Sequence, residues 1–384
     1  MSGDALHSAA QAGVAAWQRG DAAAARRAFE KVVAAGRATP QLWLLLAQAC
    51  EQLGDAATTH SALDQVLAAD GRNLFALTMK GDAFTATGDD RAATAFYQLA
   101  LTNAPPLAEQ TPDLRVRLAR AAKAVQAAGA RFTAHLEAQL GAAGVAPEEA
   151  GARFAEALAI LNGSKAVYPQ QPTSFYYPRL PLIEFYDPAA FDWLAALAEA
   201  VPAMQAELAA VLAASAGLQP YVAASPNRPN RGHALLDDPK WSAFYLWEDG
   251  APAPAARQHC PATLAALDAA PLPRIAGRSP MALFSVLQPH THIPPHNGML
   301  NTRLIGHIPL IVPDGCRLRV GNETRRVEPG RAMIFDDSIE HEAWNDSDDT
   351  RVVLLFEIWR PELDAAERTA LTVLFEAIGE YPGA

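Results

Sequence analysis

Apolar and small residues in the first hundred positions recur with a period of 34. Gly20-Asp21, Gly54-Asp55 and Gly88-Asp89 stand 34 residues apart. A small residue stands seven positions before each glycine: Gly13, Ala47 and Gly81. The residues five, nine and twelve positions after each glycine form a stripe on one helix face. These are Ala25, Phe29 and Val32 in the first unit, Thr59, Leu63 and Val66 in the second, and Ala93, Tyr97 and Ala100 in the third. Such a period indicates stacked helix-turn-helix units. We predict three repeats, the last ended by Pro105.

Helical periodicity continues to about residue 165 and then stops. Residues 114–126, 132–140 and 144–164 carry apolar residues at helical spacing, whereas residues 168–188, YPQQPTSFYYPRLPLIEFYDP, are rich in proline and aromatic residues. We therefore predict a helical repeat domain over residues 1–125, a helical cap and linker over 126–165, and a second domain over 166–384.

The second domain begins with helical patterns and changes to strands. Residues 188–214 predict one helix, or two interrupted near Pro202, and residues 241–250 and 260–271 predict a short aromatic strand and a short helix. From Met281 onward, short apolar runs alternate with turn signals. The predicted fold class is α + β with two domains: all-α helical repeats, then a cupin-like jelly roll, or double-stranded β-helix, with flanking helices.

Composition narrows the functional classes. The 384 residues carry 31 basic and 42 acidic side chains, a net charge of −11, which argues against unassisted binding to nucleic acid or to anionic lipid. The N-terminus lacks the pattern of a secretory signal, and no window approaches 18 consecutive apolar residues. The three cysteines are far apart and predict neither a disulfide framework nor a thiolate zinc site. We expect a soluble cytoplasmic protein with no nucleic-acid or membrane partner.

Two histidines are candidate metal ligands. His296 precedes a predicted strand and His341 follows one, and a jelly roll brings strand ends together at its mouth. Two imidazoles with open coordination positions suit iron(II), which usually also takes a carboxylate. That carboxylate would stand at position 298, which is Gly298. Either water completes the coordination or these residues bind no metal, and two distant histidines are more often unrelated.

Three further polar residues stand on apolar strands. Arg351 opens the strand RVVLLFEIW, where an inward guanidinium is costly unless it pairs with an anion such as a carboxylate. Ser285 could donate to the same anion, and His307 lies in the middle of RLIGHIPLIV. Alternatively, Arg351 faces solvent and His307 is a satisfied core histidine.

Other polar residues near these histidines have simpler interpretations. His290 and His292 precede two prolines that disturb the strand register, so we interpret them as loop or supporting residues. Asp336, Asp337 and Glu340 precede His341 and are metal ligands by composition alone; we interpret them as turn-forming and hydrogen-bonding residues.

These sequence blocks carry two resemblances. The 34-residue units resemble the tetratricopeptide repeat (TPR), whose concave face usually binds a peptide or protein; alternatively, the array only caps or dimerises the second domain. Residues 165–370 resemble the aspartyl/asparaginyl β-hydroxylase family of Fe(II)- and 2-oxoglutarate-dependent oxygenases, chiefly in FSVLQPHTHIPPHNGMLNTRLIGHIPLIVP, FDDSIEHEAWND and RVVLLFEIWRPEL.

The second resemblance assigns roles to individual residues. It implies that His296 and His341 bind Fe(II), with water in the place that Gly298 leaves. It implies that Arg351 and Ser285 bind the distal carboxylate of 2-oxoglutarate, that His307 lines the same site, and that O2 is consumed while a substrate C–H bond is hydroxylated.

The substrate side departs from the family pattern. The resemblance implies an arginine at position 305 that meets an acidic substrate, but this chain has Ile305 there and retains Arg303 as a substrate-binding candidate. We expect hydroxylation of an amino-acid side chain, of the Asp or Asn type, in a protein or peptide recruited by the TPR-like domain. The alternatives are a hydroxylase of a free amino acid or other small metabolite, and a non-catalytic jelly-roll binding protein.

Overall fold

The chain folds into two compact units, residues 1–164 and 165–384. The structure is a computed structural model, and it describes residues 3–214, 217–224 and 234–381. Unit 1 is helical, and unit 2 holds two antiparallel sheets with flanking helices. The predicted two-domain α + β fold is therefore confirmed.

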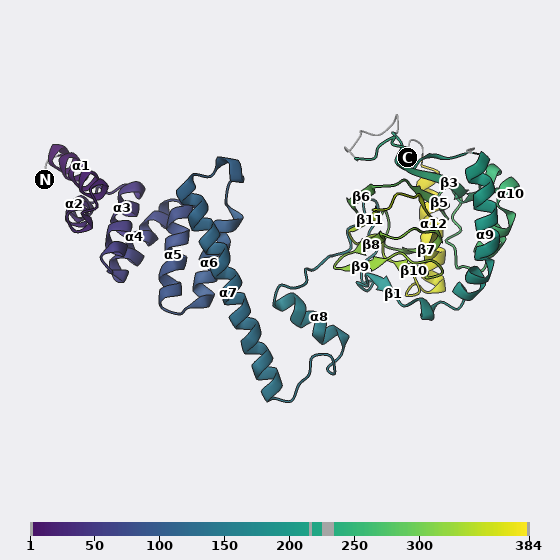
Figure 1. The fold of residues 1–384 in the computed structure, drawn as a ribbon, viewed down its shortest axis with the longest axis horizontal. Helices are drawn as coiled ribbons and strands as arrows, with labels where there is room; N and C mark the ends of the chain where they lie inside the picture. Colours follow the sequence, from purple (N-terminus) through teal and green to yellow (C-terminus); the bar gives the residue numbers. More distant parts are fainter. Residues whose placement is uncertain (1–2, 215–216, 225–233, 382–384) are drawn as a thin grey trace. The chain divides into compact units, whose positions relative to one another are not determined.

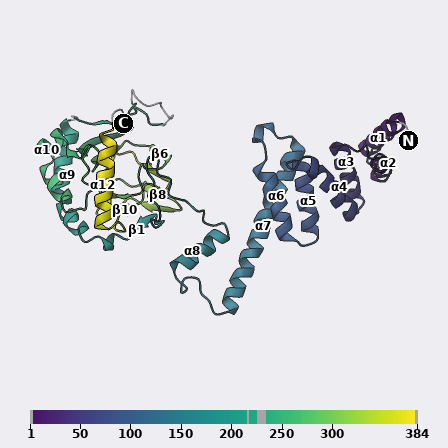
Figure 2. The same ribbon diagram turned by 180° about the vertical axis from the view of Figure 1, so that it is seen from behind.

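Unit 1 begins with three helix-turn-helix repeats (Figure 2). Their helices are α1 (Gly3–Gln18), α2 (Ala22–Ala34), α3 (Pro40–Gln52), α4 (Ala56–Ala69), α5 (Leu74–Ala86) and α6 (Asp90–Thr102). The recurring Gly-Asp pair makes each turn: the glycines have positive φ, and the aspartates cap the second helices by accepting from Ala24 N, Thr58 N and Ala92 N. The predicted repeats are thus built by local chemistry.

Small residues let the paired helices approach closely. A Cβ atom at Gly13 or Gly81 would overlap the ring of Phe29 or Tyr97 of the partner helix. The aromatic residue nine positions after each of the two turns therefore packs where the glycine seven positions before it leaves room. Phe29 lies in a core cluster with the apolar stripe residues of α2 and α4, and Tyr97 lies in a separate cluster with Ala93 and Ala121.

A one-turn helix and two longer helices follow the repeats in unit 1. A one-turn helix, η1 (Leu107–Glu109), follows the third repeat, and then come α7 (Pro112–Ala142) and α8 (Ala152–Leu161). Residues 114–126 and 132–140, which carry apolar residues at helical spacing, both lie in the single continuous helix α7. No proline falls between its second residue and its end, so nothing breaks its backbone hydrogen bonds.

Unit 2 contains a large and a small sheet (Figure 1). In the large sheet the order is β1-β10-β7-β12-β5-β3-β2, with β4 beside β3, and in the small sheet it is β6-β11-β8-β9. The strands are β1 (Phe185–Tyr186), β2 (Gln219–Pro220), β3 (Trp241–Glu248), β4 (Ala251–Pro252), β5 (Ala282–Leu287), β6 (Thr291–His296), β7 (Arg303–Ile311), β8 (Cys316–Val320), β9 (Glu323–Arg326), β10 (Met333–Phe335), β11 (His341–Asn345) and β12 (Arg351–Trp359).

The two faces of the large sheet have different partners. One face packs against the helices α9 (Leu194–Ala214), α10 (Pro254–His259) and α11 (Pro261–Leu267), and the opposite face meets the small sheet. A one-turn helix, η2 (Pro188–Ala190), precedes α9, and α12 (Ala365–Gly379) closes the chain with a capping box between Asp364 and Glu367. Successive side chains of a strand point to opposite faces of the sheet, so one set faces the covering helices and the other faces the small sheet.

Helix α9 is continuous through Pro202. By length and composition, α9 could cross a membrane. Its residues Leu197, Met204, Leu208 and Val211 are buried in the core between the helices and the large sheet.

Candidate active site

A cavity of about 980 Å3 lies in unit 2 and is lined by both sheets. All six residues singled out from the sequence line it: Ser285, His296, Arg303, His307, His341 and Arg351. They come from β5, β6, β7, β11 and β12, so the fold brings together residues up to 66 positions apart in the sequence.

Strand pairing places the two candidate metal ligands side by side. His296 ends β6 and His341 begins β11, and these residues are direct partners in the antiparallel register. Their ring centroids are 4.1 Å apart. Among the described residues, no group of three or more His, Cys, Asp or Glu side chains is placed to hold a metal. A metal at this site would therefore take two protein ligands.

Backbone carbonyls fix the tautomer of both rings. His296 Nδ1 lies 2.8 Å from Pro294 O, and His341 Nδ1 lies 3.0 Å from Ile339 O. A carbonyl only accepts, so each Nδ1 donates and each Nε2 of the neutral ring carries a lone pair. Burial lowers the pKa of His341 well below its ordinary value, and the adjacent His296 lowers it further. Neutral imidazoles with oriented Nε2 atoms are the form that binds a metal.

Gly298 leaves space that Asp337 occupies. A Cβ atom at position 298 would overlap the carboxylate of Asp337. The backbone also fixes the loop, because Gly298 N donates to Asp337 O at 2.6 Å. A side chain at position 298, where iron sites of this type usually have a carboxylate, therefore requires the Asp337 carboxylate to move.

We predict that Gly298→Asp weakens Fe(II) binding instead of adding a third ligand, because the new carboxylate collides with Asp337. Fe(II) titration under nitrogen should show at least a tenfold loss of affinity. The control is Gly298→Ala with and without Asp337→Ala: relief of the overlap should make the double variant bind better than Gly298→Ala alone. Tighter Fe(II) binding by Gly298→Asp would contradict this account of the loop.

The pleat of the large sheet directs the other candidates inward. Along β12, Val352, Leu354, Phe356 and Ile358 belong to the helix-covered core, so Arg351, Leu355 and Glu357 face the cavity. The registers Leu355↔His307 and Val353↔Ser285 put His307 and Ser285 on this same face. The three predicted cosubstrate residues therefore share one wall.

Arg351 is buried without a counter-ion. It is 2% exposed, and its Nε and Nη1 atoms have no hydrogen-bond partner in the described structure. Burial lowers its pKa to about 10, and among the described residues no carboxylate opposes that shift. Since a pKa of 10 leaves the group charged at neutral pH, the cavity wall holds an uncompensated positive charge. The alternative that Arg351 faces solvent is wrong.

His307 stands beside this charge. Neither ring nitrogen has a hydrogen-bond partner in the part of the chain that the structure describes. Burial, and then the charge of Arg351, lower the pKa of His307 to about 3, so the ring is neutral. It is not a satisfied core histidine, and its nitrogens are available to a ligand in the cavity.

Trp241 orients Ser285. The indole Nε1 donates to Ser285 Oγ at 3.1 Å, so the serine hydroxyl proton is left to be donated elsewhere. Trp241 also stacks on Tyr221, with ring centroids 4.0 Å apart, and its ring lies 6.1 Å from that of His296. This role of Trp241 could not be predicted from the sequence, because only the folded structure determines which atom an indole N–H reaches.

Arg303 lies between two carboxylates. Its Nη2 is 3.2 Å from Asp337 Oδ2, and its Nη1 is 2.6 Å from Glu357 Oε1. Burial raises the pKa of Asp337 and the charge of Arg303 opposes this shift; burial has the larger effect, and the pKa is about 6. The predicted substrate-binding arginine lines the cavity, as does Ile305, but its charge is already compensated. We call Arg303, Asp337 and Glu357 the Arg303 cluster.

The remaining polar candidates lie outside the cavity, except Asp337. His290 pairs with Asp348, and His292 pairs with Glu342. Asp336 pairs with buried Arg360, and Glu340 pairs with Arg319. Asp337 and Glu357 line the cavity and are functional candidates, but neither was recognised as one from the sequence. A carboxylate on an inward-facing strand position was the available signal for Glu357.

The segment that begins unit 2 supports the metal-site loop. Thr173 N donates to Gly298 O, and the amides of Ser174 and Phe175 donate to Met299 O, at 2.9 to 3.1 Å. The proline-rich run that ended helical periodicity is therefore part of the site's frame.

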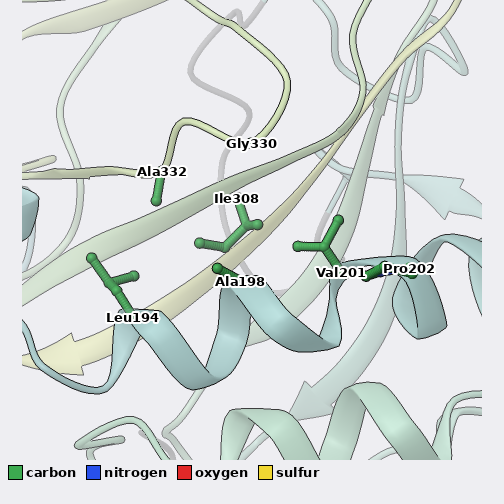
Figure 3. A pocket seen from close by; sticks show the side chains of 7 residues that line it. All are labelled: Leu194, Ala198, Val201, Pro202, Ile308, Gly330 and Ala332. Atoms are coloured by element: carbon green, nitrogen blue, oxygen red, sulfur yellow. The ribbon is translucent and has the colours of Figure 1, made fainter.

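A second pocket, of about 200 Å3, lies between α9 and the large sheet (Figure 3). Its lining is entirely apolar: Leu194, Ala198, Val201, Pro202, Ile308, Gly330 and Ala332. Among the described residues, this lining contains no donor, acceptor or titratable side chain, and we assign it no role in the reaction.

Residues 198–361 match the model of a protein family described as Aspartyl/Asparaginyl beta-hydroxylase. Over 142 residues, 36% of this chain, the sequence is 38% identical to the aspartyl/asparaginyl beta-hydroxylase of Mus musculus, of which it spans 19%. Over 188 residues, 48% of this chain, it is 36% identical to the ornithine lipid ester-linked acyl 2-hydroxylase of Rhizobium tropici, of which it spans 63%. The chain thus covers less than two thirds of either relative.

Similar solved structures include helical-repeat proteins. PcrH from Pseudomonas aeruginosa is 20% identical with a TM-score of 0.29, and the match covers 33% of this chain and 94% of that one. The Sgt2 TPR domain from Aspergillus fumigatus is 15% identical with a TM-score of 0.28, covering 32% and 79%.

Proposed function

We propose that the cavity of unit 2 is the active site of an Fe(II)- and 2-oxoglutarate-dependent hydroxylase, because residues 198–361 match the aspartyl/asparaginyl β-hydroxylase family model and most of the cavity lining lies within this match. The reaction converts a substrate C–H bond, O2 and 2-oxoglutarate into C–OH, succinate and CO2. Our proposal for the substrate is an amino-acid side chain in a protein or peptide that the helical repeats recruit.

The single observation that carries this proposal is the buried guanidinium of Arg351, whose Nε and Nη1 have no hydrogen-bond partner among the described residues. A buried positive charge without a counter-ion is costly, and a carboxylate removes that cost while accepting two parallel hydrogen bonds. A dicarboxylate such as 2-oxoglutarate supplies one carboxylate for Arg351 and a second anionic end for the metal.

The histidine pair fits iron(II). His296 and His341 would hold it through Nε2, because each Nδ1 donates to a backbone carbonyl. Two protein ligands leave several coordination positions for 2-oxoglutarate, O2 and water. When bound, the metal supplies the oxygen-activating chemistry of such oxygenases.

The chain's own residues bind and orient. Arg351 and the Ser285 hydroxyl donate to the distal carboxylate, and Trp241 Nε1 holds the serine oxygen so that its proton points away from the indole. Neutral His307 contributes a further polar contact without adding charge. The apolar side chains around the pair of histidines keep bulk water away from the reacting atoms.

The proposal is tested by mass spectrometry of peptide libraries and cell extract incubated with the protein, Fe(II) and 2-oxoglutarate. We expect a product that gains one oxygen atom, with succinate formed in equal amount. No such product, together with no succinate, would leave a non-catalytic binding protein.

Removal of the repeats separates peptide from small-molecule substrates. Unit 2 has its own cores, so residues 165–384 can be prepared alone. We predict that this fragment binds 2-oxoglutarate as tightly as the full chain does. Its kcat/KM should be at least tenfold lower for a peptide that the mass-spectrometric screen identifies as a substrate of the full chain. Equal kcat/KM for both proteins would favour a free amino acid or other small metabolite as the substrate.

A further inference from the structure

Counted over the residues that the structure describes, the Arg303 cluster carries a net negative charge. One guanidinium lies between two carboxylates, and each of the three side chains is at most 9% exposed. Asp337 Oδ1 has no hydrogen-bond partner in the described part of the chain, and Asp337 lines the cavity. A buried net charge of −1 is costly unless a cation approaches it. Among the described residues, the cluster therefore lacks a cationic partner, whereas Arg351 lacks an anionic one.

Neighbouring charges reinforce this sign. The other charged residues of the described lining, apart from Arg351, are Glu248, Asp249 and Arg278. Glu248 and Asp249 are exposed, and the half-buried Arg278 stacks over the ring of Phe375 at 4.5 Å. With the Arg303 cluster included, this part of the cavity has four carboxylates and two guanidiniums.

Aromatic rings and an aliphatic side chain complete this wall. Tyr221, Trp241 and Tyr245 line the cavity, and the faces of such rings attract ammonium and guanidinium groups. Tyr221 is close enough to Tyr245, Arg303, Asp337 and Glu357 for each of them to perturb its pKa, which burial raises. Ile305, in the same cavity, suits the methylene stem of a cationic side chain.

The anionic and cationic subsites are separate. Arg351 and Glu357 face the same way on β12 and are six residues apart, which is about 20 Å along a strand. A cosubstrate carboxylate at Arg351 and a substrate cation at Glu357 can therefore be bound together without competing.

We infer that the substrate carries a cationic group, an ammonium or a guanidinium, which Asp337 and Glu357 bind while Arg303 holds the two carboxylates in place. This inference rests on the proposed function, because it names the class of substrate for that reaction. It changes the role expected of Arg303: the arginine positions the acids and does not itself bind an acidic substrate.

The test is a calorimetric titration of the full chain with Fe(II) and 2-oxoglutarate under nitrogen. The probes are the N-acetyl methylamides of lysine, norleucine and glutamate, whose side chains end in a cationic, a neutral and an anionic group. We expect the lysine probe to bind at least tenfold more tightly than the norleucine probe, and the glutamate probe to bind most weakly.

Two variants locate the effect. Glu357→Gln keeps an oxygen that can accept from Met281 N, which Glu357 Oε2 now accepts at 3.0 Å, and it should remove most of the lysine preference. Asp337→Asn should act in the same direction. Glu323→Gln, an exposed acid on β9, is the matched control and should leave the preference unchanged. For each variant, an unchanged dissociation constant for 2-oxoglutarate establishes that the cavity is intact.

The outcomes separate this inference from the proposed function. Equal or tighter binding of the norleucine or glutamate probe overturns the inference, whether or not 2-oxoglutarate binds. A lysine preference that both variants retain also overturns it. A lysine preference that the variants lose supports the inference even if no succinate forms on admitting O2, a result that would overturn the proposed function alone.

Discussion

Arg351→Met is expected to raise the dissociation constant for 2-oxoglutarate by about 100-fold. Methionine keeps much of the side-chain volume but removes both the charge and the paired donors that a carboxylate requires, a loss that costs about 2–5 kcal/mol for a buried charged contact. Calorimetric titration of the Fe(II)-loaded protein under nitrogen measures the constant.

The same variant should be more stable than the parent protein when 2-oxoglutarate is absent. Burial lowers the pKa of Arg351 to about 10, so folding disfavours its charged form, and replacing the guanidinium removes that cost. We expect thermal unfolding without ligand to shift upward, and the stabilisation by 2-oxoglutarate to disappear. Arg317→Met, at a partly exposed arginine paired with Asp346, is the control and should show neither effect. Unchanged binding by Arg351→Met would remove its carboxylate role.

His341→Ala is expected to weaken Fe(II) binding by more than about 100-fold. The site offers two imidazoles, and losing a direct ligand costs more than losing a supporting contact, which typically costs 10- to 100-fold. Iron content after gel filtration and Fe(II) titration under nitrogen provide the measurement.

His292→Ala is the matched control for that variant. His292 lies on the neighbouring strand β6, pairs with Glu342 and stacks on Trp344, outside the cavity. It should retain iron as the parent protein does. If His341→Ala keeps its iron while His292→Ala loses it, the ligand assignment is wrong.

Local features of the fold could be predicted from the sequence. The Gly-Asp pairs combine a left-handed turn with a helix cap, and both effects act over about four residues. The strands of unit 2 were likewise visible as short apolar runs between turns. The helical character of the residues in α7 was also visible in the spacing of its apolar residues.

The candidate site was only partly predictable. A histidine, a serine or an arginine on an apolar strand is unusual enough to mark a site, and all six predicted residues line one cavity. Which residues are paired depends on register between strands far apart in sequence. For that reason the opposition of His296 and His341, the carboxylate of Asp337 in the space beside Gly298, and the two acids around Arg303 could not be read from the chain.

The central claim is that the two histidines and Arg351 bind Fe(II) and 2-oxoglutarate together. Visible absorption spectroscopy under nitrogen tests it most directly, because 2-oxoglutarate bound to Fe(II) gives a weak metal-to-ligand charge-transfer band. We predict a band that requires both components, is lost in Arg351→Met, and decays with formation of succinate when O2 is admitted. No band from the parent protein, and no succinate on adding O2, would contradict the account.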